Sequence, residues 1–295
     1  MPFLRDMQRS KRRAAGFSRE HGGFTLAEAV IVIVILGIIS AAVAVFLRGP
    51  IEAYFDVSRR AELSDAADTA LRRIARDLQR ALPNSVRIAG PCTGSTACYI
   101  EYVPIVAGGR YRAELDDSGN GDILDFADNS DNTFDLIGPP MPLPAATPLW
   151  LTVFSLGIPG ADVYSGDGSG TDIRRLYTGG GGSVTNISFT SSAVLPFESP
   201  SRRFHMVSAP VTYGCLPAVT GGTLTRYSGY GFNATQVAPP GGIASLLVSQ
   251  ASSCSFTYTT LEVARSAGLI SLSLRLTREG ETISLFRQVH VSNVP

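Results

Sequence analysis

The pattern of apolar and polar positions begins with a run long enough to cross a membrane. Residues 29–47 are nineteen consecutive residues without a charge, and they follow a basic segment. At about 1.5 Å of rise per residue, such a helix is about 28 Å long, close to the hydrocarbon thickness of a bilayer. We therefore predict a membrane-length helix. Its N-terminal edge carries a carboxylate, Glu28.

Beyond Pro50 the apolar residues narrow to one stripe. They recur at three-and-four spacing, as on one face of a helix: Leu63, Ala67, Ala70, Leu71, Ile74, Ala75, Leu78 and Leu82. Pro83 is expected to end this helix, which would run over about residues 25–81. Gly37 weakens a helix by about 1 kcal/mol relative to Ala, and Pro50 removes one backbone hydrogen bond. Both are predicted sites of helix flexibility.

From residue 84 onward the pattern changes to short alternating segments separated by Gly, Pro, Ser and Thr, which is typical of strands. The clearest strand segments are 203–215, 254–260, 269–276 and 282–291, with weaker ones at 147–156 and 184–192. Residues 277–281 are predicted to be a hairpin loop in which Gly280 supplies a positive φ. The predicted fold class is α+β, with the stripe of residues 63–82 packed on a mostly antiparallel sheet.

Charge is distributed unevenly along the chain. The formal net charge is zero, but residues 1–23 contain six bases and two acids, which leaves +4 there and −4 in the remainder. A main body with excess acid argues against nucleic-acid binding. A basic segment before an apolar run indicates that the N-terminus stays on the cytoplasmic side. A removed signal peptide is the alternative, since Ala42-Val43-Ala44 fits a small-x-small cleavage site, but the helical pattern continues beyond it.

The four cysteines favour disulfides. Cys92 and Cys98 bracket a five-residue loop, and Cys215 and Cys254 lie near predicted strands, so we favour these two pairs among three connectivities. Zinc is disfavoured because the ligand spacing does not match a finger. Disulfides place this part of the chain in an oxidising compartment, the periplasm of a Gram-negative bacterium.

One loop has ligand spacing similar to that of an EF-hand. Asp116, Ser118, Asn120 and Asp122 occupy positions one, three, five and seven, but position twelve is Ala127 where a bidentate Glu is needed. A tight turn is the favoured interpretation, calcium is the alternative, and no other cofactor is expected. We find no nucleophile elbow, zinc-protease or phosphate-loop motif, and His205 and His290 lie within strand patterns. The chain is therefore not predicted to be an enzyme.

The segment "GGFTLAEAVIVIVILGIIS" resembles the N-terminal signal of type IV prepilins and type II secretion pseudopilins. The resemblance implies that a prepilin peptidase cleaves between Gly23 and Phe24 and methylates the new amine of Phe24. It also implies that Glu28, the fifth mature residue, pairs with the terminal amine of a neighbouring subunit. A carboxylate that is merely solvated at the headgroup level is the alternative.

The resemblance defines three regions: a removed leader, 1–23; a helix, 24–82, with a membrane and polymerisation half (24–49) and an amphipathic half (50–82); and a β-rich periplasmic head, 83–295. Residues 203–215 and 284–295 resemble minor pilins of the mannose-sensitive haemagglutinin (MSHA) pilus. The implied function is a minor pilin that initiates or caps a pilus. Alternatives are a J-type minor pseudopilin of a type II secretion system, a tip adhesin and an anchored periplasmic enzyme.

The same resemblance implies the partners and the location. The expected partners are prepilin peptidase, other minor pilins, the major pilin and an inner-membrane assembly platform. The chain would span the inner membrane once and then enter the pilus, at its tip.

Overall fold

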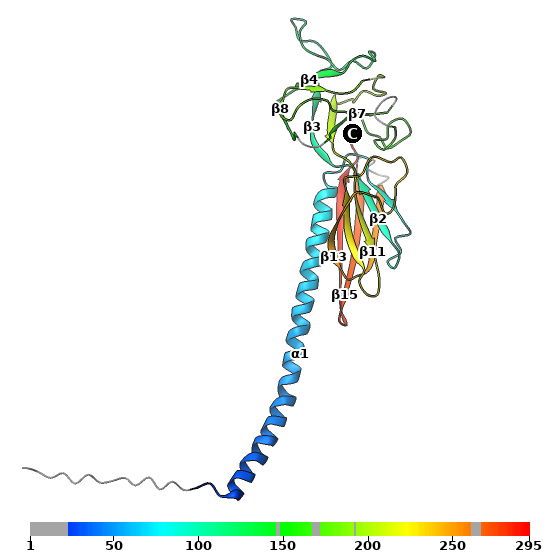
Figure 1. Ribbon diagram of the computed structural model, residues 1–295. Helices are drawn as coiled ribbons and strands as arrows, with labels where there is room; N and C mark the ends of the chain where they lie inside the picture. The colour runs from blue at the N-terminus through cyan, green and yellow to red at the C-terminus, as the bar shows by residue number, and fades with distance from the viewer. Residues whose placement is uncertain (1–22, 146–147, 167–171, 192, 261–266) are drawn as a thin grey trace, which may run out of the picture. The chain divides into compact units, whose positions relative to one another are not determined.

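The structure is a computed structural model, and it describes residues 23–145, 148–166, 172–191, 193–260 and 267–295. The chain divides into two compact units, Met1–Phe55 and Asp56–Pro295. One helix, α1 (Leu26–Leu78), begins in the first unit and ends in the second (Figure 1). The predicted leader, 1–23, lies outside the described residues except for Gly23.

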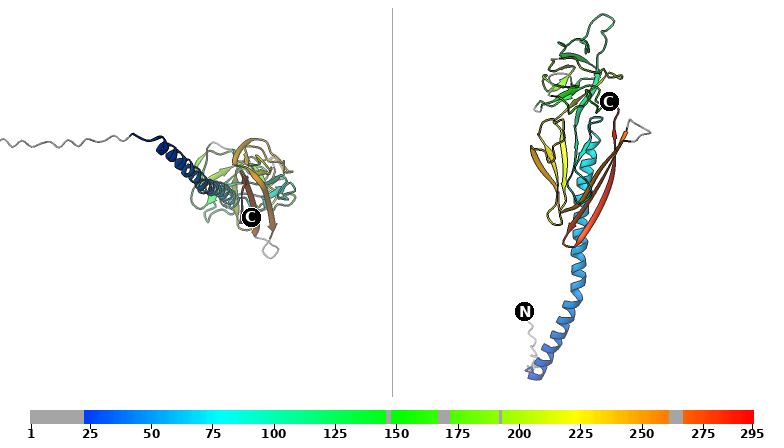
Figure 2. Two further views of the ribbon diagram at one scale, coloured as in Figure 1. Left: turned by 90° about the horizontal axis from the view of Figure 1, so that it is seen from below. Right: turned by 90° about the vertical axis from the view of Figure 1, so that its right-hand side faces the viewer.

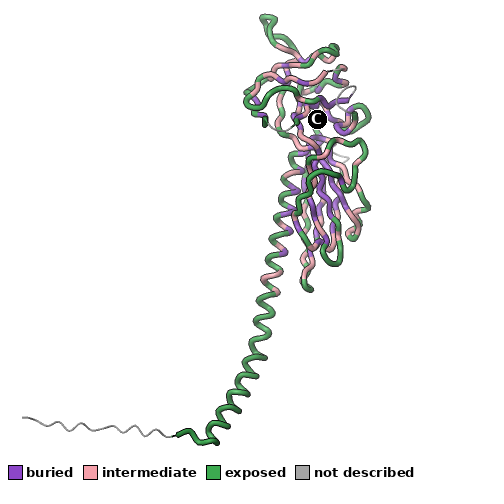
Figure 3. The backbone as a smooth tube through the Cα atoms, viewed as in Figure 1, coloured by how far each residue is buried: buried purple, intermediate pink, exposed green. Residues whose placement is uncertain are grey.

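Helix α1 is continuous through Gly37 and Pro50. In the first unit every described residue is exposed, whereas from Leu63 onward α1 buries one stripe (Figure 3). The buried members are Leu63, Ala67, Ala70, Leu71, Ile74, Ala75 and Leu78. This stripe is the one that the spacing predicts. The helix stops within the expected range, before Pro83.

The second unit contains sixteen strands among its described residues, and every ladder between them is antiparallel. A five-stranded sheet has the order β1 (Arg87–Ala89), β2 (Cys98–Tyr102), β11 (Val211–Leu216), β12 (Thr223–Ser228), β13 (Ile243–Ser249). A three-stranded sheet has the order β14 (Ala251–Thr260), β15 (Ala267–Arg278), β16 (Glu281–Ser292). A six-stranded sheet has the order β7 (Arg174–Leu176), β6 (Trp150–Thr152), β10 (Arg203–Val207), β3 (Ile105–Tyr111), β4 (Thr133–Ile137), β9 (Asn186–Ser188). Strands β5 (Met141–Leu143) and β8 (Gly182–Val184) pair with each other. The α+β fold class is confirmed.

The buried stripe of α1 packs against two sheets rather than the single sheet that the sequence predicts. Side chains from the five-stranded and three-stranded sheets form one core with it. The right-hand view of Figure 2 shows the two sheets to the left and right of the helix, and Figure 1 shows their labelled strands on one side of it. The predicted hairpin is confirmed: β15 and β16 are joined by Glu279 and Gly280, with φ of 49° and 86°. Two positive φ values in a two-residue loop are the geometry that matches the twist of paired strands.

Polar contacts attach the helix to the five-stranded sheet. The Asp77 carboxylate of α1 accepts hydrogen bonds from the hydroxyls of Tyr102 (3.2 Å) and Tyr213 (2.5 Å), on neighbouring strands β2 and β11. Arg226 of β12 lies 3.8 Å from the same carboxylate. Burial raises the pKa of both tyrosines, so both stay hydroxyl donors at neutral pH. Asp77 therefore contacts three adjacent strands from one helix position.

The six-stranded sheet has a second core, which the sequence analysis did not predict. Its buried centre contains Phe134, Phe204 and Met206. The prediction of one strand over 203–215 is wrong, because that segment is two strands in different sheets. Phe204 of β10 packs in this second core, whereas Tyr213 of β11 packs against the helix. Ser208, Ala209 and Pro210 separate the two strands, and Pro210 lacks the N–H that a ladder needs.

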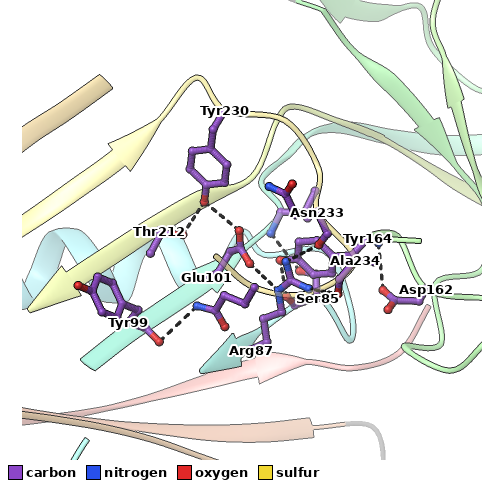
Figure 4. Close-up of polar contacts among 12 residues, drawn as sticks. Ser85, Arg87, Tyr99, Glu101, Asp162, Tyr164, Thr212, Tyr230, Asn233 and Ala234 are labelled. Carbon is purple, nitrogen blue, oxygen red and sulfur yellow. Dashed lines mark hydrogen bonds and ion pairs between the residues drawn. The ribbon is translucent and has the colours of Figure 1, made fainter. Parts of the chain in front are cut away.

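A buried ion pair lies at one end of the five-stranded sheet (Figure 4). Glu101 of β2 is 1% exposed and accepts hydrogen bonds from Arg87 Nε (2.5 Å) and the Tyr230 hydroxyl (3.0 Å). The two remaining guanidinium nitrogens of Arg87 donate to the carbonyls of Asn233 and Ala234. The same guanidinium lies 3.5 Å from the ring centre of Tyr164. Two loops from elsewhere in the chain are thereby attached to β1 and β2.

Candidate processing and assembly site

The predicted cleavage site lies in an accessible segment immediately before α1. Gly23, Phe24 and Thr25 are outside regular secondary structure, and all three are exposed. The Phe24 residue is 82% exposed, and nothing lies within 4 Å of a Cβ built on Gly23. The Gly23–Phe24 peptide bond therefore lies outside the helix, and a peptidase could bind it in an extended conformation without breaking helical hydrogen bonds.

Glu28 and Thr25 form a reciprocal cap at the start of the helix. The Thr25 hydroxyl oxygen accepts a hydrogen bond from the Glu28 backbone N–H (3.2 Å). The Glu28 carboxylate oxygen Oε2 in turn accepts from the Thr25 N–H (3.3 Å) and from its hydroxyl (3.2 Å). This is the capping box, in which two backbone donors at a helix start are satisfied by side chains. The carboxylate also lies favourably at the positive end of the helix dipole.

Only one of the two Glu28 oxygens takes part in the cap. All three capping contacts involve Oε2 or the Thr25 hydroxyl, and among the described residues Oε1 has no hydrogen-bond partner. An ionised carboxylate has about four acceptor positions. Glu28 is thus held in one orientation by its own chain while Oε1 remains available to a donor from outside the chain.

The rest of this unit is an exposed apolar surface. Three of its most exposed residues are Leu26 (83% exposed), Val45 (78%) and Phe46 (77%). By length and composition, α1 is able to cross a membrane. Such a surface has to be covered by lipid or by other apolar helices, because it far exceeds the patches that soluble monomers expose.

Gly37 and Pro50 are the two predicted sites of flexibility in the helix, and both lie inside it. Nothing lies within 4 Å of a Cβ built on Gly37, so its small size is not required by packing within this chain. Pro50 has no N–H to donate to the carbonyl four residues earlier. Flexibility at both positions stays a prediction.

The other predicted residues belong to the second unit. The structure joins Cys92 to Cys98 and Cys215 to Cys254, the pairs favoured by spacing. The second bond links β11 to β14, and hence the two sheets that contact the helix.

The acidic loop forms a tight turn. The Asp116 carboxylate accepts hydrogen bonds from the backbone N–H groups of Ser118 (2.9 Å) and Asn120 (2.8 Å). The Asp122 carboxylate accepts instead from the side chain of Asn186 in β9 (2.9 Å). Within the described ranges, no group of three or more His, Cys, Asp or Glu side chains is arranged to hold a metal ion. Calcium binding by this loop, the alternative interpretation, is untested.

Sequence reasoning overlooked the role of Thr25. The spacing Thr25-x-x-Glu28 is a capping-box pattern directly before an apolar run, so the signal was present. The same carboxylate is also explained as an isolated charge at a membrane edge, so the pattern alone does not assign Thr25 as its partner.

The described chain thus combines an antiparallel β head with one N-terminal helix that is long and apolar enough to anchor it in a membrane. A comparison with protein families identified the prokaryotic N-terminal methylation motif at residues 19–44. This motif supports a type IV pilin-like protein, and it implies processing by a prepilin peptidase and assembly partners of the pilus type. Comparisons with curated proteins and with solved structures returned no match.

Proposed function

We propose that this chain is a minor pilin that initiates or caps assembly of a type IV pilus. The observation that carries the proposal is the bonding of Glu28, which lies within the methylation motif. Its Oε2 atom caps its own helix, whereas Oε1 has no hydrogen-bond partner among the described residues. Cleavage after Gly23 creates a terminal amine on Phe24. Oε1 of one subunit then accepts a hydrogen bond from the Phe24 amine of its neighbour.

The proposed pair acts on register more than on total binding energy. Apolar helices that leave the bilayer and pack side by side slide past one another with little positional preference. A buried ion pair adds little net stability, but a buried charge left without its partner costs about 3–5 kcal/mol. Every stagger except the one that joins Glu28 to an amine is therefore disfavoured. The capping bonds from Thr25 reduce the freedom that Glu28 loses when the pair forms.

The size of the chain supports a minor rather than a major subunit. Removal of 23 of the 295 residues leaves 272, and most of them belong to the β-rich unit. A repeating helical shaft requires every subunit surface to fit its neighbours. A bulky head is accommodated more easily at an end of the filament, so we place this subunit at the tip, with its head in the periplasm before assembly. Membership of an MSHA-like system is the finer form of the proposal.

The test compares Glu28→Gln with Glu52→Gln in cells that assemble the filament. Both substitutions remove one carboxylate from an exposed position on α1, and among the described residues Glu52 has a surface ion pair with Arg48 (3.6 Å) and no other partner. We expect Glu28→Gln to lower the amount of this chain in sheared filaments more than tenfold and Glu52→Gln to leave it unchanged. Mass spectrometry of wild-type protein should find a methylated Phe24 terminus. Normal incorporation of Glu28→Gln would refute the proposed role of the carboxylate.

A minor pseudopilin of a type II secretion system is the second candidate, because the same motif precedes both kinds of subunit. Deleting the gene distinguishes them. Fewer pili with unchanged enzyme secretion supports the pilus, whereas loss of secreted hydrolases with unchanged pili supports the secretion system. Normal numbers of pili that no longer adhere would instead identify a tip adhesin.

A further inference from the structure

Two arginines of the six-stranded sheet face each other across neighbouring strands. Arg110 of β3 and Arg203 of β10 are directly opposite in the antiparallel register. Directly opposite residues have their Cβ atoms about 5 Å apart on the same face of the sheet, and like charges in this position destabilise the pair. Opposite charges at two such positions stabilise a sheet, so this pairing of like charges needs an explanation.

No acid in the described part of the chain compensates this repulsion. Both arginines are exposed, and within the described ranges neither guanidinium has a salt bridge or a side-chain hydrogen bond. Their sequence neighbours differ: Arg112 is 3.6 Å from Asp135, and Arg202 is 2.6 Å from Glu114. The nearby acids therefore pair with Arg112 and Arg202, and the two opposed arginines have no acidic partner among the described residues.

The arginine pair borders a hollow on the sheet surface. An open depression of about 370 Å³ is lined by Gly108, Gly109, Arg110, Ile137, Arg203, Phe204 and His205. Gly108 is opposite His205, and a Cβ added there would lie 3.2 Å from the imidazole. A glycine at this position therefore keeps the floor of the hollow open. The volume is within the range of small-molecule sites in proteins.

His205 adds polarity to the hollow but no charge at neutral pH. Burial, with a smaller contribution from Arg203, lowers the pKa of His205 to about 4. A neutral imidazole has one donor and one acceptor nitrogen. The positive charge at the hollow therefore comes from the two guanidinium groups, which bind carboxylate and sulfate oxygens in bidentate geometry.

We propose that this hollow binds a small ligand through a carboxylate or sulfate group held between Arg110 and Arg203. The anion supplies the counter-charge that the described residues do not provide, and Ile137, which is 48% exposed, offers an apolar contact beside it. The site is independent of Glu28 and of filament assembly. Its failure would leave the proposed minor-pilin function intact.

The test titrates the full-length chain in detergent micelles with sodium glucuronate and, separately, with sodium sulfate. Glucose and sodium chloride serve as probe controls. The variants are Arg110→Gln and Arg203→Gln, and the matched control is Arg275→Gln, which removes an exposed arginine from β15, outside the hollow. Calorimetry measures affinity, and thermal unfolding without ligand measures folding.

We expect saturable binding of at least one anion and of neither control. Each of the two hollow variants should lower the affinity at least tenfold, and Arg275→Gln should change it less than twofold. Stronger binding of glucuronate would identify a carboxylate ligand, and stronger binding of sulfate a sulfate ester. Both hollow variants should unfold at the same or a higher temperature than wild type, because the repulsion is gone. Absence of saturable binding, or equal losses in all three variants, would overturn the proposal.

Discussion

Two glutamates show how differently one chain uses the same carboxylate. Glu101 is buried in the head, and both of its oxygens accept hydrogen bonds from the same chain, one from Arg87 and the other from Tyr230. Glu28 lies exposed at the start of α1, and only Oε2 has partners within the described residues. Glu101 has a partner on each oxygen and joins segments within the head. Glu28 keeps one oxygen without a partner among the described residues, and that oxygen is accessible to a contact between chains.

The surroundings of the two residues follow the same division. Glu101 accepts a hydrogen bond from Tyr230, and its partner Arg87 lies over the ring of Tyr164. Burial raises the pKa of the Tyr230 hydroxyl, which keeps it a donor. Around Glu28 every described residue of the unit, 23–55, is exposed, and most of these residues are apolar. The head is therefore complete as a folded unit, whereas the N-terminal helix requires lipid or other helices to cover its surface.

The largest stability effect should come from Glu101→Ala. Removing one partner of a buried ion pair leaves the other charge uncompensated, and we expect the head to lose about 3–4 kcal/mol of unfolding free energy. The control is Glu279→Ala, which removes an exposed carboxylate that pairs with Arg59 and should cost less than about 1 kcal/mol. Denaturant unfolding followed by near-ultraviolet circular dichroism measures both. Equal losses would contradict the distinction between the two kinds of glutamate.

Long periodic features of this chain could be predicted from sequence, because many residues repeat the same signal. The stripe from Leu63 to Leu78 repeats over four turns, and the hairpin at Glu279-Gly280 joins two long alternating strands. The cysteine pairs followed from a short loop and from a pair near strands. In each case the local pattern and the tertiary contact agree.

The weak strand segments predicted at 147–156 and 184–192 contain β6 and β9, but β7 was not predicted. The six-stranded sheet itself could not be predicted, because strands of three residues carry too short a period to show which distant strands they pair with. The burial of Glu101 could not be predicted from the sequence either. Its neighbours Ile100 and Tyr102 are both buried, so alternation along β2 places Glu101 on the opposite face, where a strand normally exposes its polar residues. It is the Tyr230 loop, far along the chain, that covers that face. The pairing of Arg110 with Arg203 likewise depends on a register between distant segments.

A smaller loss of unfolding free energy should come from Asp77→Ala. Asp77 lies in α1 and contacts strands of the head. Asp77→Ala removes the acceptor for two tyrosine hydroxyls and the charge beside Arg226. Hydrogen bonds to a charged group contribute about 1.5–3 kcal/mol, so we expect a loss of about 2 kcal/mol in the same unfolding measurement. Asp65→Ala, on an exposed position of the same helix, should be neutral within about 0.5 kcal/mol. A neutral Asp77→Ala would show that apolar packing alone holds the helix in register.

The smallest change in stability should come from the capping box of Thr25 and Glu28 at the start of α1. Thr25→Val keeps the shape of the side chain but removes the hydroxyl that accepts from the Glu28 N–H, at a cost of about 1 kcal/mol to the helix start. Amide hydrogen exchange in detergent micelles should then be about fivefold faster in the first turn of α1 and unchanged beyond it. Thr25→Ser retains the hydroxyl and should exchange like wild type. If Thr25→Val also exchanges like wild type, Glu28 is not oriented by its own chain, and Oε1 has no preferred direction in which to meet a neighbouring amine.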